Sequence, residues 1–101
     1  MKKIIQKKFS QDIKFVYSDN NSLSIIFQSN ELLSNVVGEF NNNIKELEKI
    51  VGTNIYTRGN SISIKGDIEK NEVIKNAIEF LVEQFLSIGS IEIKDIQSSL
   101  N

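Results

Sequence analysis

The polar residues best suited to contact a ligand lie close together, within residues 36–66. Three consecutive asparagines, at 41–43, are poor interior residues for a helix, but near a helix start their amides can cap the helix, remain exposed or contact a ligand. Tyr56 and Arg58 alternate with apolar residues further along, which puts both on the polar face of a predicted strand. This stretch therefore offers noncovalent binding through amide, phenol and guanidinium groups.

The residues that usually carry catalysis are missing. The chain has no cysteine, which excludes disulfides and thiolate metal sites, and no histidine, which removes the commonest metal ligand and the usual general base. The spacing of the aspartates and glutamates indicates a distribution over the surface. We therefore expect a protein that is not an enzyme, with no catalytic, cofactor or metal site.

Length, composition and charge indicate one soluble domain. A chain of 101 residues suffices for one hydrophobic core, and 40% hydrophobic with 25% charged residues is typical of a globular protein. The net charge of −1 lacks the broad positive field of a strong nucleic-acid binder, so any such binding must be local. The opening MKKIIQKKF has no apolar run of secretory length, and no apolar stretch is long enough to span a membrane, which favours the cytoplasm.

The first residues, 1–11, show no clear period and are predicted as a tail or an edge segment. Basic residues concentrate around this part of the chain, whereas the last third is acidic. A phosphate-contacting arm and a solvated, flexible terminus both agree with the cluster, and the second is the more common. The cluster comprises Lys2, Lys3, Lys7, Lys8 and Lys14.

A β-hairpin is predicted next. Apolar residues alternate over 13–17 and again over 23–27, and the sequence Ser-Asp-Asn-Asn between them favours a turn. The second strand is the more apolar. We therefore expect it inside the sheet, with the first strand at an edge.

Two helices are predicted to meet at Gly38. Ser29 or Asn30 is a suitable N-cap for a first, short helix over 31–37. The second helix has a narrow apolar stripe at i, i+4, i+7 and i+11 and ends at a glycine in the left-handed conformation. The stripe comprises Phe40, Ile44, Leu47 and Val51.

Residues 54–65 predict a tight hairpin with a defined register. Gly59-Asn60 suits a two-residue turn with glycine at its first central position. This turn pairs Thr57 with Ile62 and puts the apolar side chains of both strands on one face. The other face is polar and carries Tyr56, Arg58, Ser61 and Ser63.

A long helix is predicted from Asp67 to about Ile88, where Gly89 ends it. Its apolar residues cover more than one face, so either it crosses the sheet and packs on the other helices, or part of it docks on another domain or subunit. Residues 91–101 are predicted as a short strand or a helical tail. The apolar residues of the long helix are Val73, Ile74, Ala77, Ile78, Phe80, Leu81, Val82 and Phe85.

The predicted order of elements resembles the KH domain of the βααββα type. We therefore predict an α+β fold, in which an antiparallel sheet packs on helices in the KH-like order, with an additional N-terminal strand. Gly38 stands at the junction where KH domains carry a GxxG loop that clamps nucleotides, and Asn41 stands at the fourth position of that loop. The stretch IKELEKIVGTNI is similar to the following KH helix and its exit strand.

Residues 25–100 are similar to the N-terminal KH-like domain of PhoH family proteins, phosphate-starvation-inducible P-loop ATPases of the bacterial cytoplasm. The similarity implies a tail over 1–11, a KH-like domain over 12–90 and a C-terminal tail over 91–101 that leads toward an ATPase domain. ATP and Mg are expected only in that further domain, since this chain contains no GxxxxGK[ST] sequence. The similarity rests on Asn30-Glu31-Leu32-Leu33, Gly38-x-x-Asn-x-Asn43-Ile44, Leu47-Glu48 and Arg58-Gly59-Asn60 leading to Ile64-x-Gly66.

The resemblance implies a non-catalytic module that positions single-stranded RNA for the ATPase. Arg58 would contact phosphates and Tyr56 would stack on a base. Each side chain also has a purely structural explanation: Arg58 can support the hairpin, Tyr56 can cover the sheet, and Asn60 tolerates positive φ. The candidate RNA contacts are Gly38, Asn41, Asn43, Tyr56, Arg58 and Asn60.

A second interpretation involves no RNA. The domain would be a protein-interaction or oligomerisation module that packs on its own ATPase domain or forms a homo-oligomer. The acidic long helix and the net charge near zero favour it.

Overall fold

The structure is a computed structural model that describes residues 12–18 and 20–101. The predicted tail or edge segment at 1–11, with its lysines, lies outside the described residues. The elements follow in the order β1 (Ile13–Tyr17), β2 (Leu23–Phe27), α2 (Asn30–Val37), η1 (Glu39–Asn41), α3 (Asn42–Val51), β3 (Ile55–Arg58), β4 (Ser61–Ile64), α4 (Ile68–Ile88) and α5 (Ile93–Ser99).

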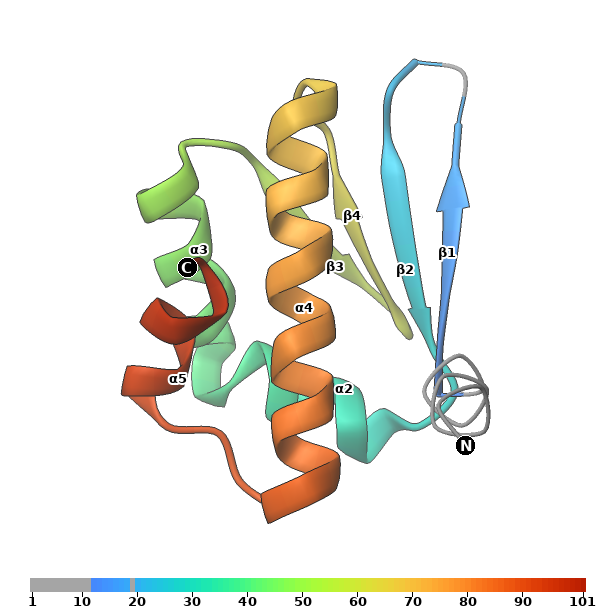
Figure 1. Cartoon of the computed structure of the whole chain (residues 1–101). Helices are drawn as coiled ribbons and strands as arrows, with labels where there is room; N and C mark the ends of the chain where they lie inside the picture. The colour runs from blue at the N-terminus through green and yellow to red at the C-terminus, as the bar shows by residue number, and fades with distance from the viewer. Residues whose placement is uncertain (1–11, 19) are drawn as a thin grey trace, which may run out of the picture.

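The four strands form one antiparallel sheet in the order β1-β2-β4-β3. Figure 1 shows the helices gathered on one side of this sheet, with α4 lying lengthwise over it. Strand β1 occupies an edge and the more apolar β2 lies inside, as predicted. The α+β fold class, with the KH-like order of elements and an additional N-terminal strand, is thereby confirmed.

The register of the β3–β4 hairpin is also confirmed. Thr57 pairs with Ile62, and Arg58 pairs with Ser61 next to the turn. Gly59, at the first central position of the turn, has φ 59°, a conformation that glycine adopts without a steric penalty. Alternation along each strand then sends one set of side chains toward the helices and the other set away from them.

The core lies between the sheet and α4. Its fully buried side chains come from the inward face of the strands, from one side of α4, and from α2, α3 and α5, which contribute Val36, Leu47 and Ile96, so burial follows the period of two in the strands and the helical period in α4. Burying one large aliphatic or aromatic side chain of this kind stabilises the fold by about 1.5–3 kcal/mol, compared with leaving the side chain exposed to water. The largest are Ile13, Leu23, Ile25, Phe27, Val36, Leu47, Ile62, Ile64, Ile74, Ile78, Leu81 and Ile96.

The helix ends follow the capping residues in the sequence. Ser29 Oγ accepts a 3.1 Å hydrogen bond from Leu32 N at the start of α2, and Asp67 Oδ1 accepts one of 2.8 Å from Lys70 N at the start of α4. Gly52 and Gly89, both left-handed, end α3 and α4. Of the two caps considered for α2, the structure therefore selects Ser29.

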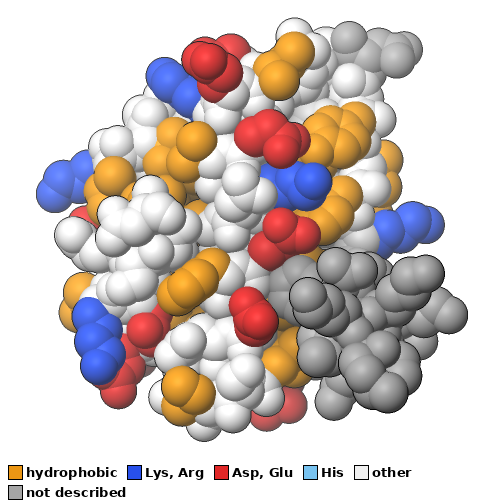
Figure 2. Space-filling view, in the orientation of Figure 1, with side chains coloured by type: hydrophobic (Ala, Val, Ile, Leu, Met, Phe, Trp, Pro, Cys, Tyr) orange, Lys and Arg blue, Asp and Glu red, His pale blue; other side chains and the backbone are white. Residues whose placement is uncertain are grey.

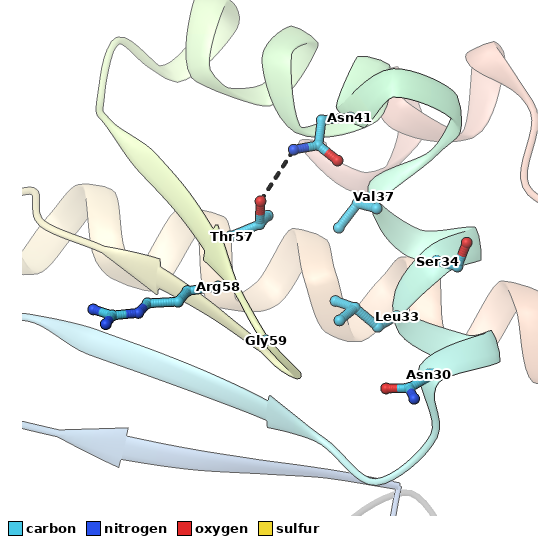
Figure 3. Close-up of a pocket in the computed structure, with 8 residues that line it drawn as sticks. All are labelled: Asn30, Leu33, Ser34, Val37, Asn41, Thr57, Arg58 and Gly59. Carbon is cyan, nitrogen blue, oxygen red and sulfur yellow. Dashed lines mark hydrogen bonds between the residues drawn. The ribbon is translucent and has the colours of Figure 1, made fainter.

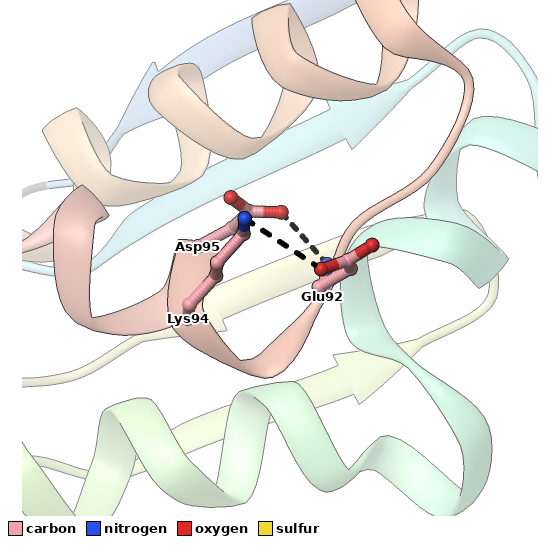
Figure 4. Close-up of polar contacts among 3 residues, drawn as sticks. All are labelled: Glu92, Lys94 and Asp95. Atoms are coloured by element: carbon pink, nitrogen blue, oxygen red, sulfur yellow. Dashed lines mark hydrogen bonds and ion pairs between the residues drawn. The ribbon is translucent and has the colours of Figure 1, made fainter.

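The segment predicted as a short strand or a helical tail is helix α5. The side chain of Ile96 is buried in the core, while Ile93 remains 82% exposed. The helix begins with a capping box, in which Glu92 N donates a 2.7 Å hydrogen bond to Asp95 Oδ2 (Figure 4). The Glu92 side chain accepts from the Asp95 backbone in return. Lys94 Nζ lies 3.9 Å from Glu92 Oε1 on the exposed side of this turn. The cap satisfies the buried Asp95 carboxylate and fixes where α5 turns back onto α3 and α4.

The long helix α4 does pack on the sheet and on the other helices, yet part of its apolar surface remains uncovered. Val73, predicted on the apolar face, is 41% exposed, and Leu86 is 45% exposed. In the part of the chain that the structure describes, no helix has the length and apolarity needed to cross a bilayer.

Candidate functional site

A groove runs between helix α2, the α2–α3 junction and the end of strand β3 (Figure 3). Its volume is about 320 Å³. Of the described residues that line it, Arg58 alone is charged. The lining comprises Asn30, Leu33, Ser34, Val37, Asn41, Thr57, Arg58 and Gly59.

Helix α2 supplies one wall of the groove. Residues four apart on a helix lie one above the other, so Asn30 and Ser34 form a polar row and Leu33 and Val37 an apolar row beside it. Asn30 and Ser34 are exposed, whereas Val37 is only 9% exposed because its side chain also packs in the core. This side of α2 therefore presents apolar side chains to the groove, with an amide and a hydroxyl group next to them.

The junction after α2 has an unusual backbone. Gly38 has φ 81° and ψ 170°, a region restricted to glycine, and Phe40 and Asn41 follow with φ 55° and 59°. A left-handed conformation costs a residue with a side chain roughly 1–2 kcal/mol. Two such residues in succession therefore store strain at the rim of the groove.

Phe40 corrects the sequence prediction. It was expected to begin the apolar stripe of the second helix, but its side chain is 81% exposed. The left-handed turn at residues 40 and 41 delays the α-helix until Asn42, so the buried stripe begins at Ile44. The three asparagines after Phe40 indicate in the sequence that the helix begins later, because asparagine is unfavourable in a helix interior.

Asn41 joins the junction to the sheet. Its Nδ2 donates a 3.0 Å hydrogen bond to Oγ1 of Thr57 on β3, and the two side chains face one another in Figure 3. This bond holds the strained turn against the end of the hairpin. Thr57 was expected on the apolar face of the hairpin, and it does point to that side, but at this end the face is open to the groove.

Gly38 and Asn43 form one structural unit. Asn43 Nδ2 donates to the carbonyl of Val36 at 3.1 Å and, at 3.5 Å, to that of Asn35. These are carbonyls of the last turn of α2, which lack partners within the helix. A Cβ placed on Gly38 would lie 2.7 Å from the Asn43 amide, so the packing at this point requires glycine. The structure thus gives Asn43 a supporting part beneath the junction.

Asn60 ties the hairpin turn to the neighbouring strand. Its Nδ2 donates a 3.2 Å hydrogen bond to the carbonyl of Phe27, and Phe27 N donates one of 2.8 Å to the carbonyl of Asn60. The turn needs positive φ only at Gly59, so a tolerance of positive φ is not what Asn60 contributes.

Tyr56 and Arg58 lie on the other side of the sheet. Both side chains belong to the set that points away from the helices, and Arg58 extends away from Asn41 and Val37 in Figure 3. Lys65 Nζ lies 5.6 Å from the centre of the Tyr56 ring. Of the six candidate contacts, Asn41 therefore lines the groove, and Arg58 borders it although its side chain extends to the other face. Gly38 and Asn43 shape the junction, Asn60 bonds to the neighbouring strand, and Tyr56 faces away from the groove.

Ionisable groups with a shifted pKa lie away from the groove. Burial raises the pKa of Glu79 on α4, with Lys75 opposing this shift and Glu72 adding to it. Burial and a hydrogen bond to Glu72 raise the pKa of Tyr17 at the end of β1. Among the described residues, no three acidic side chains gather in a way that could hold a metal ion.

Of the eight lining residues, sequence reasoning named only Asn41 and Arg58 as candidate contacts, because nothing local indicates that an end of the sheet stays open. The six that it missed are Asn30, Leu33, Ser34, Val37, Thr57 and Gly59. Asn71 was missed as a buried polar residue of α4. Comparisons of the chain with protein-family models, with curated proteins and with solved structures found no match.

Proposed function

We propose that this domain binds single-stranded RNA in the groove between α2 and β3. The observation that carries the proposal is the pair of consecutive left-handed residues, Phe40 and Asn41: Asn41 lines the groove, and the ring of Phe40, the residue before it, is 81% exposed. Strained backbone of this kind persists where the surrounding structure holds it and is common at ligand-binding sites. An exposed aromatic ring is a platform on which an unpaired base can stack.

The groove has the mixed chemistry that single-stranded RNA requires. Its apolar floor, formed by Leu33 and Val37, suits the face of a base, and the amides of Asn30 and Asn41 can both donate to and accept from base edges. Arg58 borders the groove and its side chain extends from there toward the open sheet face, where its positive charge can meet a phosphate at the end of the groove. One charged residue in the lining predicts weak binding with a modest dependence on salt.

The resemblance to the KH-like domain of PhoH family proteins suggests the context of this binding. In that setting the domain works in the cytoplasm and is followed by a P-loop ATPase domain, which binds ATP and Mg and acts on the RNA strand that this domain holds. The domain itself then contributes no catalytic group. Gly38 and Asn43 support the junction, while Phe40 and Asn41 contact the strand.

Fluorescence anisotropy with a labelled single-stranded oligoribonucleotide of about four nucleotides, the length that a KH groove holds, tests the proposal. Asn41→Gly keeps the left-handed backbone but removes the amide, and Phe40→Gly relieves strain while removing the ring. Both should weaken binding several-fold, and Phe40→Tyr should not. Equal affinity in all four proteins, or no binding by the wild type at low salt, would refute RNA binding in the groove.

A homo-oligomer is the second candidate function, and a different surface favours it. A second groove, of about 740 Å³, lies between α3, α4 and the end of α5 and exposes Ile50, Ile68 and Val73. Its border carries Glu69, Lys70 and Glu72, so a twofold axis that passes beside Lys70 would bring Lys70 of one copy to a glutamate of the other. Light scattering over a range of concentrations should then show a dimer that Val73→Asp dissociates. A monomer at all concentrations would remove this candidate.

A further inference from the structure

Among the described residues, the four strands contribute positive charge and no acidic side chain to the sheet face turned away from the helices. None of the four strands contains aspartate or glutamate. Lys14 and Arg58 point to this face, and the position of Lys65 Nζ, 5.6 Å from the Tyr56 ring, puts a third cation there. The chain as a whole has a net charge of −1, so this local excess of positive charge differs from the overall charge balance.

The register of the sheet arranges these residues in two rows that cross all four strands. In the first row, Lys14 and Arg58 stand at opposite edges, with Ile26 and Ser61 between them. In the second row, the Tyr56 ring follows the hydrogen-bonded hydroxyls of Ser24 and Ser63, which are 3.2 Å apart. Neighbouring strands lie about 4.8 Å apart, so the two edge strands of this four-stranded sheet are about 14 Å apart. The cations at the two edges therefore lie on either side of a strip of serine hydroxyls and apolar side chains.

Acidic side chains lie on the opposite side of the molecule. Figure 2, which views the helical side, shows red side chains over α4, the helix whose sequence contains Glu69, Glu72, Glu79 and Glu83. Among the described residues, no carboxylate lies within 4 Å of the amino or guanidinium group of Lys14, Arg58 or Lys65. Their charges are therefore available to an anionic ligand.

We propose that this open sheet face binds the phosphate backbone of the RNA strand as it leaves the groove. Arg58 connects the two surfaces, because its residue borders the groove while its side chain extends toward the open face. Lys14 and Lys65 contact further phosphates, and Tyr56, 50% exposed, stacks on a base. This inference rests on the proposed function, which concerns the groove alone.

The length of the RNA separates the two claims. A four-nucleotide probe fills only the groove, whereas a probe of about twelve nucleotides, within the range that single-strand binding domains cover, also reaches the sheet face. The longer probe should bind about tenfold more tightly. Its salt dependence should also be steeper, since each phosphate contact adds about 0.7 to the slope of log K against log salt for a single strand.

Lysine variants locate the extra contacts. Lys14→Ala and Lys65→Ala should each weaken binding of the long probe about threefold and lower its salt slope by about 0.7, with no effect on the short probe. Tyr56→Ala should also weaken the long probe, and Tyr56→Phe should preserve its affinity. Lys45→Ala and Lys49→Ala, at exposed positions of α3 on the helical side, are matched controls that should change neither probe.

Each outcome decides between the claims. If both probes bind equally, or if the lysine variants of the sheet and of α3 have the same effect, the sheet-face inference is wrong while RNA binding in the groove stands. If neither probe binds, the proposed function fails and the inference fails with it. A gain with length that Lys14→Ala and Lys65→Ala reduce, and Lys45→Ala does not, supports the sheet face.

Discussion

The side-chain amide of Asn41 donates a 3.0 Å hydrogen bond to Oγ1 of Thr57 and so connects the strained α2–α3 junction to strand β3. The bond lies in exposed surroundings, so its net contribution to stability is about 0.5–1.5 kcal/mol at most. Thr57→Val should therefore lower the melting temperature by only a few degrees but loosen the junction and weaken RNA binding several-fold. Thr57→Ser retains the hydroxyl and should bind like the wild type. If Thr57→Val and Thr57→Ser bind equally well, the connection has no part in recognition.

Gly38 and Asn43 should show strong energetic coupling. Gly38→Ala forces a Cβ to 2.7 Å from the Asn43 amide at φ 81°, and we expect a loss of about 3 kcal/mol in the free energy of unfolding. Asn43→Ala removes the hydrogen bonds to the end of α2 and should cost about 1–2 kcal/mol. Because the second change also removes the clashing atoms, urea unfolding of the double variant should show a loss at least 1 kcal/mol smaller than the sum. Strict additivity would contradict this packing.

Asn71 is a buried polar connection that urea or thermal unfolding can test. Its Oδ1 accepts a 3.1 Å hydrogen bond from Gly66 N, and its Nδ2 donates to the carbonyl of Asn21, joining the β1–β2 turn to the start of α4. Asn71→Ala leaves these backbone groups without their partner and should cost about 2–3 kcal/mol, or roughly 10 °C in melting temperature. Asn76→Ala, at an exposed position of the same helix, should change the melting temperature by no more than about 2 °C. Similar losses in both variants would mean that the amide connections do not matter.

Glu79 should make the fold less stable as the pH rises. Burial raises the pKa of this carboxyl, so the folded state binds more protons than the unfolded state between the ordinary and the raised value. Its contribution to stability is therefore complete at acid pH and is lost as the pH rises through that interval. Glu79→Gln should melt higher than the wild type at neutral pH, and the difference should vanish toward about pH 4. Glu83→Gln, at an exposed position of α4, is the control, and an equal gain there would contradict the assignment to Glu79.

The elements that alternation, helical period and capping residues define were predictable. The β3–β4 register followed from Gly59-Asn60, because a two-residue turn leaves one pairing possible. Helix ends at Ser29 and Gly52 followed from backbone groups that need partners. In each case the structure is determined by neighbours in the sequence.

The site was harder to predict because it depends on contacts between distant residues. Asn41 meets Thr57 across sixteen positions of the chain, and Asn71 meets Asn21 across fifty. Periodicity assigned Phe40 to a buried stripe because helical spacing continues through it, whereas the left-handed backbone at residues 40 and 41 overrides that spacing. Both faces of the β3–β4 hairpin were assigned correctly, but which face borders the groove depends on the packing of α2.

Nuclear magnetic resonance with ¹⁵N-labelled protein tests the central claim most directly. Titration with a four-nucleotide single-stranded RNA should shift the backbone amide signals of the junction and the hairpin end, including those of Gly38, Asn41, Thr57 and Gly59. The signals of Ile50 and Val73, in the second groove, should remain in place. Saturable shifts confined to the first set are the predicted result. No shifts at low salt, or shifts confined to Ile50 and Val73, would contradict RNA binding in the groove between α2 and β3.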